Sequence, residues 1–264
     1  MYKIKIVSIS IIVLLALVFG LIYMQATTNT VQNFPTLNYA SEPVPDFNQY
    51  ERVQEKKRAF FDYLKPAIAA QNEYIATVRS LIFDFQALHL TDQELSAAQQ
   101  EELDWLITEY RVKNIDEPVA VYTELLRKVD VIPADLVLAQ TANESAWGTS
   151  RFARKGYNFF GIWCFEEGCG FVPKQRNDGA AHEVAKFDDL NEGMYSYMRN
   201  LNSHPAYKDL RLIRLELTED DKEVTGHALA EGLIKYSERG EEYIEELRQM
   251  IKVNKTFMAT DTSS

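Results

Sequence analysis

Glycine is distributed unevenly along the sequence, and this restricts the fold more than any other property. The chain has 11 glycines in 264 residues, and none of them lies between Leu21 and Trp147. Ten of the 11 lie from Gly148 onward. Because glycine supplies the positive backbone φ angles of many tight turns, a long segment without it favours helices joined by few turns. We therefore predict a helical first half and a second half that also contains turns and short strands.

Apolar side chains recur at helical spacing through the glycine-free part. Pro66 is expected to start one helix or to kink it, and residues 91–94, Thr-Asp-Gln-Glu, match a capping box that would open the next. We assign residues 50–115 to an N-terminal helical region whose aromatic side chains pack in its core. The apolar positions of its first long helix are Ile68, Ile75, Val78, Ile82 and Phe85.

The N-terminus differs from the rest of the chain. Residues 6–24 are apolar apart from two serines, and Lys3 and Lys5 precede them. This length suits a membrane-spanning helix better than the core of a signal peptide, and the basic end should stay in the cytoplasm. Because residues 24–26 match a cleavage site poorly, we favour a signal anchor in residues 1–26, held in the inner membrane, over a cleaved signal peptide. Either alternative exports the remainder, and residues 27–49, rich in Thr, Asn, Pro and Ser, are expected to be a linker.

Charge and cysteine content limit the partners and cofactors. The net charge of −11 argues against a nucleic-acid partner, which would require a basic face. Cys164 and Cys169 are the two cysteines, and their short spacing in an exported chain predicts a disulfide. His182-Glu183 begins like a zinc-protease motif, but Lys186 stands where the second histidine should be. We expect no metal, no other cofactor and a monomer.

One candidate catalytic residue follows from local pattern alone. Pro133 suits the start of a helix and Gly148 its end, and Glu144 falls near that end on the same stripe as Leu136 and Gln140. Burial beside apolar residues would raise the pKa of this carboxyl, and a protonated acid can donate to a leaving oxygen. The alternative is an ordinary surface glutamate that is solvated or paired with an arginine.

The part of the chain after Glu144 is expected to mix a small sheet with further helices. Turn residues and alternating apolar residues predict an antiparallel sheet over about residues 160–188. Asp188 or Asp189 can cap the next helix and Thr225 another, and a last helix follows Gly240. Residues 257–264 are expected to be a disordered tail.

Two blocks of sequence resemble a known family. Residues 140–148 read Gln-Thr-Ala-Asn-Glu-Ser-Ala-Trp-Gly, and residues 158–162 read Asn-Phe-Phe-Gly-Ile. Together with the tyrosine motif around Tyr236 and Tyr243, they resemble the glucosaminidase family of bacterial peptidoglycan hydrolases, in particular its exported Bax-type members. The resemblance implies a mostly α, lysozyme-like α+β domain with a small β-hairpin lobe. We place this domain at residues 116–256, after the N-terminal helices and the membrane segment.

The resemblance also implies an activity and a set of site residues. It implies cleavage of the peptidoglycan glycan strand after N-acetylglucosamine by an endo-beta-N-acetylglucosaminidase, with Glu144 as the general acid. Glu183 is the candidate second catalytic residue, Asp188 and Asp189 are its rivals, and the substrate 2-acetamido group could replace a second carboxylate. The candidate substrate-binding residues are Asn158, Phe160, Trp163 and Tyr236. Tyr236 could instead belong to the core, and Phe160 and Trp163 could instead pack between the lobes.

Two further functions stay open on the sequence alone. The domain could be a cell-wall binding or scaffolding module without activity, although an intact block around Glu144 argues against this. It could also be a lytic transglycosylase, which uses a single glutamate and leaves an anhydro sugar.

Overall fold

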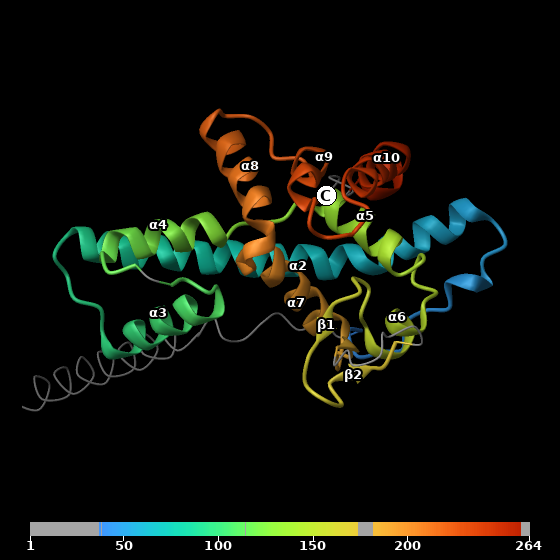
Figure 1. The fold of residues 1–264 in the computed structure, drawn as a ribbon, viewed down its shortest axis with the longest axis horizontal. Helices are drawn as coiled ribbons and strands as arrows, with labels where there is room; N and C mark the ends of the chain where they lie inside the picture. The colour runs from blue at the N-terminus through green and yellow to red at the C-terminus, as the bar shows by residue number, and fades with distance from the viewer. Residues whose placement is uncertain (1–36, 38, 114, 174–181, 260–264) are drawn as a thin grey trace, which may run out of the picture. The chain divides into compact units, whose positions relative to one another are not determined.

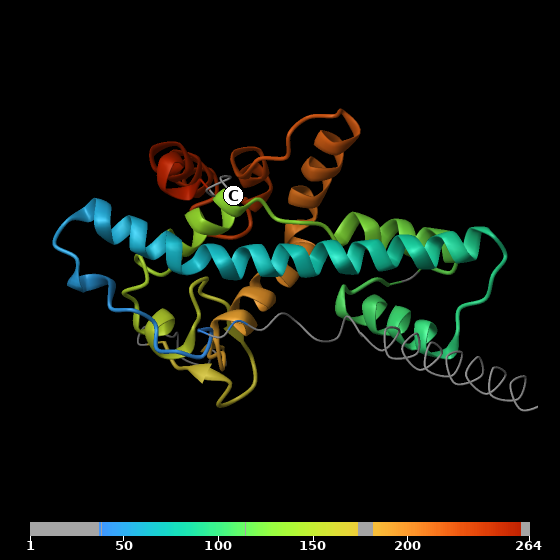
Figure 2. The ribbon, with the colours of Figure 1, turned by 180° about the vertical axis from the view of Figure 1, so that it is seen from behind.

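The computed structural model describes residues 37, 39–113, 115–173 and 182–259. Its longest element is helix α2, Val53–Leu90. Helix α4 runs along the C-terminal half of α2, while α5 and α10 lie beside its N-terminal half (Figures 1 and 2). Pro66 lies inside α2 and does not start it. The buried side chains of α2, which include Phe60, Leu64, Ile68 and Ile82, fix the helix by packing, and this outweighs the one backbone bond that proline removes.

The folded unit begins before the boundary expected from the sequence. Residues 39–49 were assigned to a linker, but Ala40, Val44 and Phe47 are buried. Phe47 belongs to a short 3₁₀ helix, η1 (Phe47–Gln49), and its ring lies 5.3 Å from that of Phe60. The carbonyl of Ala40 accepts a hydrogen bond from the backbone N–H of Leu190 (3.0 Å). This segment is therefore part of the core.

Helix α3 (Ala97–Glu109) completes the N-terminal helical region, and α4 (Pro118–Lys128) follows it. The capping box predicted at residues 91–94 is displaced, because Ser96 and Gln99 form it instead. The Thr91 hydroxyl donates to the carbonyls of Ala87 and Leu88 and so closes the end of α2. Glu117 caps α4, and Pro118 occupies the first position of the helix, where proline is common.

Helix α5 (Ala134–Glu144) packs against α2 and against the later helices α9 and α10, and every residue from Leu136 to Ala142 is buried. Asp189 and Thr225 cap α7 and α9, as expected. Met258 is buried at the end of α10, so the last helix runs beyond the predicted domain boundary at residue 256. The remaining elements are α6 (Arg151–Gly156), α7 (Leu190–Ser203), η2 (Pro205–Tyr207), α8 (Lys208–Glu219), α9 (Gly226–Leu229), η3 (Ala230–Leu233) and α10 (Glu241–Met258).

The predicted small sheet is present as three short strands. They are β1 (Trp163–Cys164), β2 (Gly170–Phe171) and β3 (Glu183–Ala185), in the antiparallel order β1-β3-β2. Trp163 pairs with Val184 and Phe171 pairs with the same residue from the other side. Cys164 and Cys169 form the predicted disulfide, with their Cα atoms 6.2 Å apart. A mostly helical chain with one small antiparallel sheet is consistent with the expected lysozyme-like α+β fold.

The expected membrane segment, residues 6–24, lies outside the described residues, as does most of the expected tail. Within the part of the chain that the structure describes, no helix is both long and apolar enough to cross a membrane.

Candidate functional site

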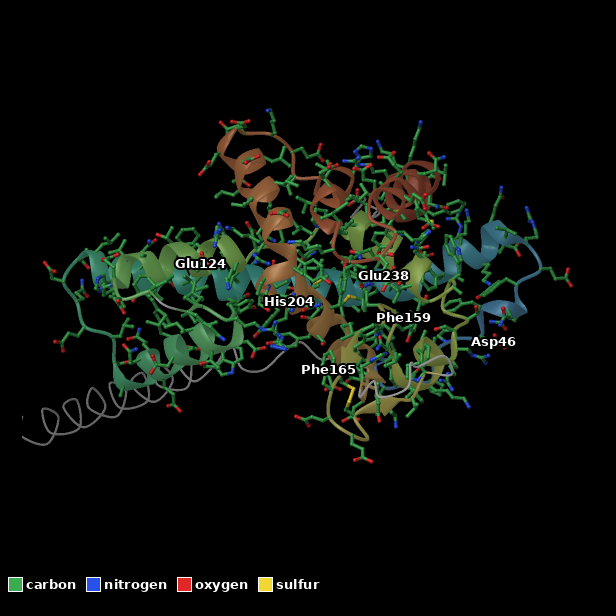
Figure 3. All side chains as sticks on the ribbon, viewed as in Figure 1. Asp46, Glu124, Phe159, Phe165, His204 and Glu238 are labelled. Carbon is green, nitrogen blue, oxygen red and sulfur yellow. A yellow bond between two sulfur atoms is a disulfide. The ribbon has the colours of Figure 1, made fainter. Side chains whose placement is uncertain are left out.

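Glu144 opens onto a cleft of about 1030 Å³. Five parts of the chain line it: the turn after α3, the end of α5, the loop from Phe160 to Phe165, one face of α7 with the turn that follows it, and the segment before α10. Figure 3 labels three lining residues on different parts of the chain, namely Phe165, His204 and Glu238. Among the described residues, Glu144 and Glu238 are the carboxylates that line this cleft.

The end of α5 is fixed by local backbone geometry. Glu144 is the last residue of the helix, and Ala146, Trp147 and Gly148 all have positive φ angles. The Ser145 hydroxyl donates to the carbonyl of Thr141 (2.5 Å) and accepts from the N–H of Gly148 (2.7 Å). A β-carbon at Gly148 would lie 2.6 Å from the ring of Phe47. The turn therefore requires glycine there and holds the preceding carboxyl in one place.

A chain of hydrogen bonds orients the Glu144 carboxyl. The Tyr243 hydroxyl donates to Oε1 of Glu144 (2.8 Å) and accepts from Nε2 of Gln140 (3.0 Å). Oε1 of Gln140 accepts in turn from the Tyr197 hydroxyl (2.5 Å). Gln140 and Tyr197 are buried, and hydrogen-bonded groups that are buried and fully paired hold a fixed geometry. A β-carbon at Gly161 would lie 3.9 Å from Oε2 of Glu144. The second carboxyl oxygen therefore faces the loop from Phe160 to Phe165.

The surroundings of Glu144 favour its protonated form. Burial raises the pKa of the Glu144 carboxyl above its ordinary value, the hydrogen bond from Tyr243 and the charge of Arg239 act in the opposite direction, and Glu246 adds to the rise. Burial and the nearby Glu144 also raise the pKa of Tyr243, so this tyrosine keeps its proton and stays a donor. A carboxylic acid with a raised pKa at the floor of a cleft is suited to proton transfer.

Aromatic rings form much of the cleft. Phe160 stacks on Tyr197 with ring centroids 3.8 Å apart, and Tyr236 stacks on Tyr243 at 5.5 Å. The Tyr236 hydroxyl donates to the carbonyl of Phe160 (2.9 Å), which ties the two stacks together. Trp163 lines the opening with 56% of its surface exposed. The exposed ring of Trp163 offers a flat apolar face with a polar edge, which suits a sugar.

The comparisons with known proteins identify the family of the chain. The model of the Glucosaminidase family, described as mannosyl-glycoprotein endo-beta-N-acetylglucosaminidase, matches residues 119–256. The chain belongs to the glucosaminidase family. Protein bax of Escherichia coli (strain K12) is 31% identical over 229 residues, which cover 86% of this chain and 80% of that protein. No solved structure matches the chain. The predicted resemblance to Bax-type glucosaminidase-domain proteins is thus confirmed, and membership supports a glycosidase related to peptidoglycan.

The structure places the predicted site residues of this glucosaminidase-family chain in two groups. Glu144, Phe160, Trp163 and Tyr236 line one cleft. Asn158 is buried beneath it and is not among the lining residues. Its amide nitrogen donates to the carbonyls of Ile162 and Ala185. Its amide oxygen accepts from the backbone N–H groups of Phe160 and Ile162. The structure therefore gives Asn158 the role of shaping the loop that carries Phe160, in place of the expected contact with substrate.

Glu183 also lies away from the lining of the cleft. It is buried on β3, where Oε1 accepts from the N–H of Gly168 (3.2 Å) and Oε2 from the N–H of Gly170 (2.8 Å). Both oxygens thus hold the disulfide-closed turn of the β lobe. Asp188 and Asp189, the alternatives to Glu183 as second catalytic carboxylate, do not line the cleft either. Asp188 is exposed outside it, and Asp189 caps α7.

Several residues in or behind the cleft have roles that were not anticipated from the sequence. Tyr243 was matched to the family motif, but its hydrogen bond to Glu144 was not foreseen. Gln140 carried a local signal, because it lies one turn before Glu144 on the same face of α5. Arg111, Arg199 and His204 had none, since the fold alone brings the turn after α3 to the face of α7.

Proposed function

We propose that this protein is an exported endo-beta-N-acetylglucosaminidase that cuts the glycan strand of peptidoglycan, with Glu144 as its general acid. The observation that carries the proposal is the position of Glu144, at the floor of the cleft with one oxygen held by Tyr243. Burial raises the pKa of this carboxyl. The carboxyl is therefore oriented, and its protonated form is favoured more than in an exposed glutamate, at a place that a sugar chain can reach.

The geometry supports a sequence of proton transfers through one carboxyl. Protonated Glu144 donates to the glycosidic oxygen while the bond from that oxygen to the sugar C1 breaks. The carbonyl oxygen of the substrate 2-acetamido group attacks C1 and forms a cyclic cation. Water then attacks C1, the bond from C1 to the acetamide oxygen breaks, and the Glu144 carboxylate takes the proton of that water. Two displacements at C1 retain the configuration of the sugar.

The state of Glu183 supports the acetamide as the internal nucleophile. Both oxygens of Glu183 accept from backbone N–H groups of the β lobe, and moving this carboxylate into the cleft would leave those donors without partners. A substrate group that supplies its own nucleophile removes the need for a second carboxylate. We assign Glu183 to the stability of the β lobe and Glu144 to both proton-transfer steps.

The product of digestion tests the bond and the mechanism together. Residues 27–264 would be incubated with purified peptidoglycan sacculi, and the new reducing ends identified by mass spectrometry and by the NMR signal of the first-formed anomer. The proposal predicts reducing N-acetylglucosamine in the β configuration. Inversion would exclude the acetamide route, and a reducing muramic acid would exclude the proposed bond.

Two other functions predict different outcomes of the same digestion. A lytic transglycosylase would leave an anhydro sugar, and its use of a single glutamate matches the single carboxyl held by Tyr243. A binding or scaffolding module would release no fragment while still sedimenting with sacculi.

The proposal also includes the location of the protein. We propose that residues 6–24 hold the chain in the inner membrane with the catalytic domain outside the cytoplasm, because basic residues precede that apolar run. N-terminal sequencing of the mature protein tests this, and a start near Thr27 would show a cleaved signal instead.

A further inference from the structure

One wall of the cleft carries three nitrogen-bearing side chains, and we name Arg111, Arg199 and His204 the cationic wall. They come from the turn after α3, from α7 and from the end of α7. Arg199 lies next to two further polar lining residues, Ser196 and Asn200, on one face of that helix. His204 is labelled in Figure 3. The cleft that holds Glu144 thus has a side rich in donors.

The turn that presents Arg111 is held firmly in a costly conformation. Arg111 has a φ angle of 54°, a region that residues with a side chain rarely adopt. The Nζ atom of the buried Lys128 donates to the carbonyls of Tyr110 and Arg111, each at 2.9 Å. The N–H of Val112 donates to the carbonyl of Ile107 (2.8 Å). Backbone strain that neighbouring groups enforce is concentrated at functional sites.

The charges of the cationic wall are only partly balanced within the protein. Arg199 pairs with Glu109 (Nε to Oε1, 3.3 Å), and Glu109 also accepts from the hydroxyl of Tyr195. No ion pair joins Arg111 to an acidic side chain within the residues that the structure describes. Burial and the like charge of Arg199 lower the pKa of Arg111, and the charge of Glu109 acts in the opposite direction. An arginine still keeps its charge at neutral pH, so a positive site remains open toward the cleft.

The cationic wall does not serve to neutralise the catalytic carboxyl. The charged groups that act on the pKa of Glu144 are Arg239, just before α10, and Glu246, within α10. His204 adds a donor, because its Nδ1 accepts from the N–H of Ala206 (3.2 Å) and the neutral ring then carries its proton on Nε2. The cationic wall thus offers hydrogen-bond donors and positive charge that are not used to neutralise Glu144. Such a surface suits an anionic part of the ligand.

We propose that the cationic wall binds a carboxylate of the peptidoglycan strand, either on the lactyl group of muramic acid or on the peptide attached to it. This inference rests on the proposed function, since it assumes that the cleft holds that glycan. The fork of an arginine matches a carboxylate with two parallel hydrogen bonds. The chain as a whole has a net charge of −11 and would repel an anionic polymer. Arg111 also lies outside the residues 119–256 that match the family, so this contact would be supplied by the N-terminal helical region.

The experiment compares three forms of one glycan. The first is sacculus peptidoglycan with its peptides, the second is the same glycan stripped of peptides by an amidase so that the lactyl carboxylate remains, and the third is the stripped glycan with that carboxylate converted to an amide. Values of kcat/KM are measured for the wild type, for Arg111→Gln and Arg111→Lys, and for Lys113→Gln. Lys113 is exposed two positions away and does not line the cleft, so it is the matched control for lost charge.

We expect the wild type to prefer a carboxylate-bearing glycan over the amidated one by about tenfold or more, which corresponds to about 1.4 kcal/mol. Arg111→Gln should lower that preference several-fold, Arg111→Lys should restore part of it, and Lys113→Gln should leave it unchanged. A preference for the first glycan alone identifies the peptide carboxylate. A preference for the second alone identifies the lactyl carboxylate, because that group is tied up in an amide bond while the peptide is attached. A preference shared by the first two shows that the cationic wall accepts either carboxylate.

Other outcomes separate the two proposals. Equal rates on all three glycans, or an unchanged preference in a folded Arg111→Gln protein, would overturn the cationic-wall inference and leave the proposed activity intact. Cleavage of none of the three by the wild type would overturn the proposed function itself. Circular dichroism of each variant shows whether it is folded.

Discussion

Replacing Tyr243 by Phe isolates one hydrogen bond to the catalytic carboxyl. The substitution keeps the ring and removes the hydroxyl that donates to Oε1 of Glu144 (2.8 Å) and accepts from Gln140 (3.0 Å). The bond from Tyr243 lowers the pKa of Glu144, against the rise that burial causes. Without it, the pKa of Glu144 rises further. The limb of the pH–rate profile on which activity falls as Glu144 ionises should therefore move to higher pH.

The same substitution has a cost in stability that follows from the structure. Gln140 is fully buried, and Tyr243→Phe leaves its Nε2 donor without the acceptor at 3.0 Å. Leaving a buried donor unpaired costs about 1–3 kcal/mol. Tyr197 still donates to the other end of the same amide, so we expect a loss near the lower end of that range. Urea unfolding measures this directly.

Tyr236→Phe is the matched control. Tyr236 stacks on Tyr243, but its hydroxyl donates to the carbonyl of Phe160 and not to Glu144. Its removal can change the rate through the shape of the cleft, but it should leave the position of the ionisation limb unchanged. The assay is the initial rate of muropeptide release from purified sacculi across a series of pH values. If the ionisation limb does not move in Tyr243→Phe, or moves equally in Tyr236→Phe, the hydrogen bond from Tyr243 does not set the pKa of Glu144.

Three other predictions concern the framework of the site. Gly148→Ala should destabilise the fold by at least about 2 kcal/mol. A residue with a β-carbon in the left-handed backbone conformation costs about 1–2 kcal/mol, and this β-carbon would also lie 2.6 Å from the ring of Phe47. An unchanged urea midpoint would contradict this. Glu183→Gln should lose about 1–3 kcal/mol of stability through an unpaired backbone N–H while keeping most of its activity, and inactivity in a folded variant would make Glu183 catalytic. Denatured, unreduced protein should show no free thiol, since Cys164 and Cys169 are bonded; two thiols would disprove the disulfide in the exported protein.

Features encoded within a few residues could be predicted from the sequence. The helix that ends at Glu144, the glycine that follows, the cap at Asp189 and the pair of Cys164 with Cys169 all follow from short-range patterns. The capping box shows where such patterns fail. Two candidate motifs lie close together there, and Thr91 is used to end α2, so that Ser96 opens the next helix.

Contacts across long sequence separations could not be predicted in this way. Tyr243 is separated from Glu144 by 99 positions, and no local pattern indicates that it donates to that carboxyl. The cleft position of Arg111 likewise depends on how Lys128 of α4 holds the turn after α3. Residue type also misled the prediction for Asn158 and Glu183, since a family motif identifies a position but not whether its polar atoms face substrate or backbone. Both proved to be bonded to backbone groups.

The activity of Glu144→Gln on purified sacculi decides whether Glu144 is the general acid. Glutamine keeps the shape of the side chain and can still accept from Tyr243, but it has no proton to transfer to a leaving oxygen. General acid catalysis contributes about 10²–10⁴-fold to rate, so we predict a loss of at least about a hundredfold in muropeptide release, with an unchanged circular dichroism spectrum and retained binding to sacculi. A folded Glu144→Gln protein that keeps more than about a tenth of the wild-type rate would contradict the assignment of Glu144 as the acid.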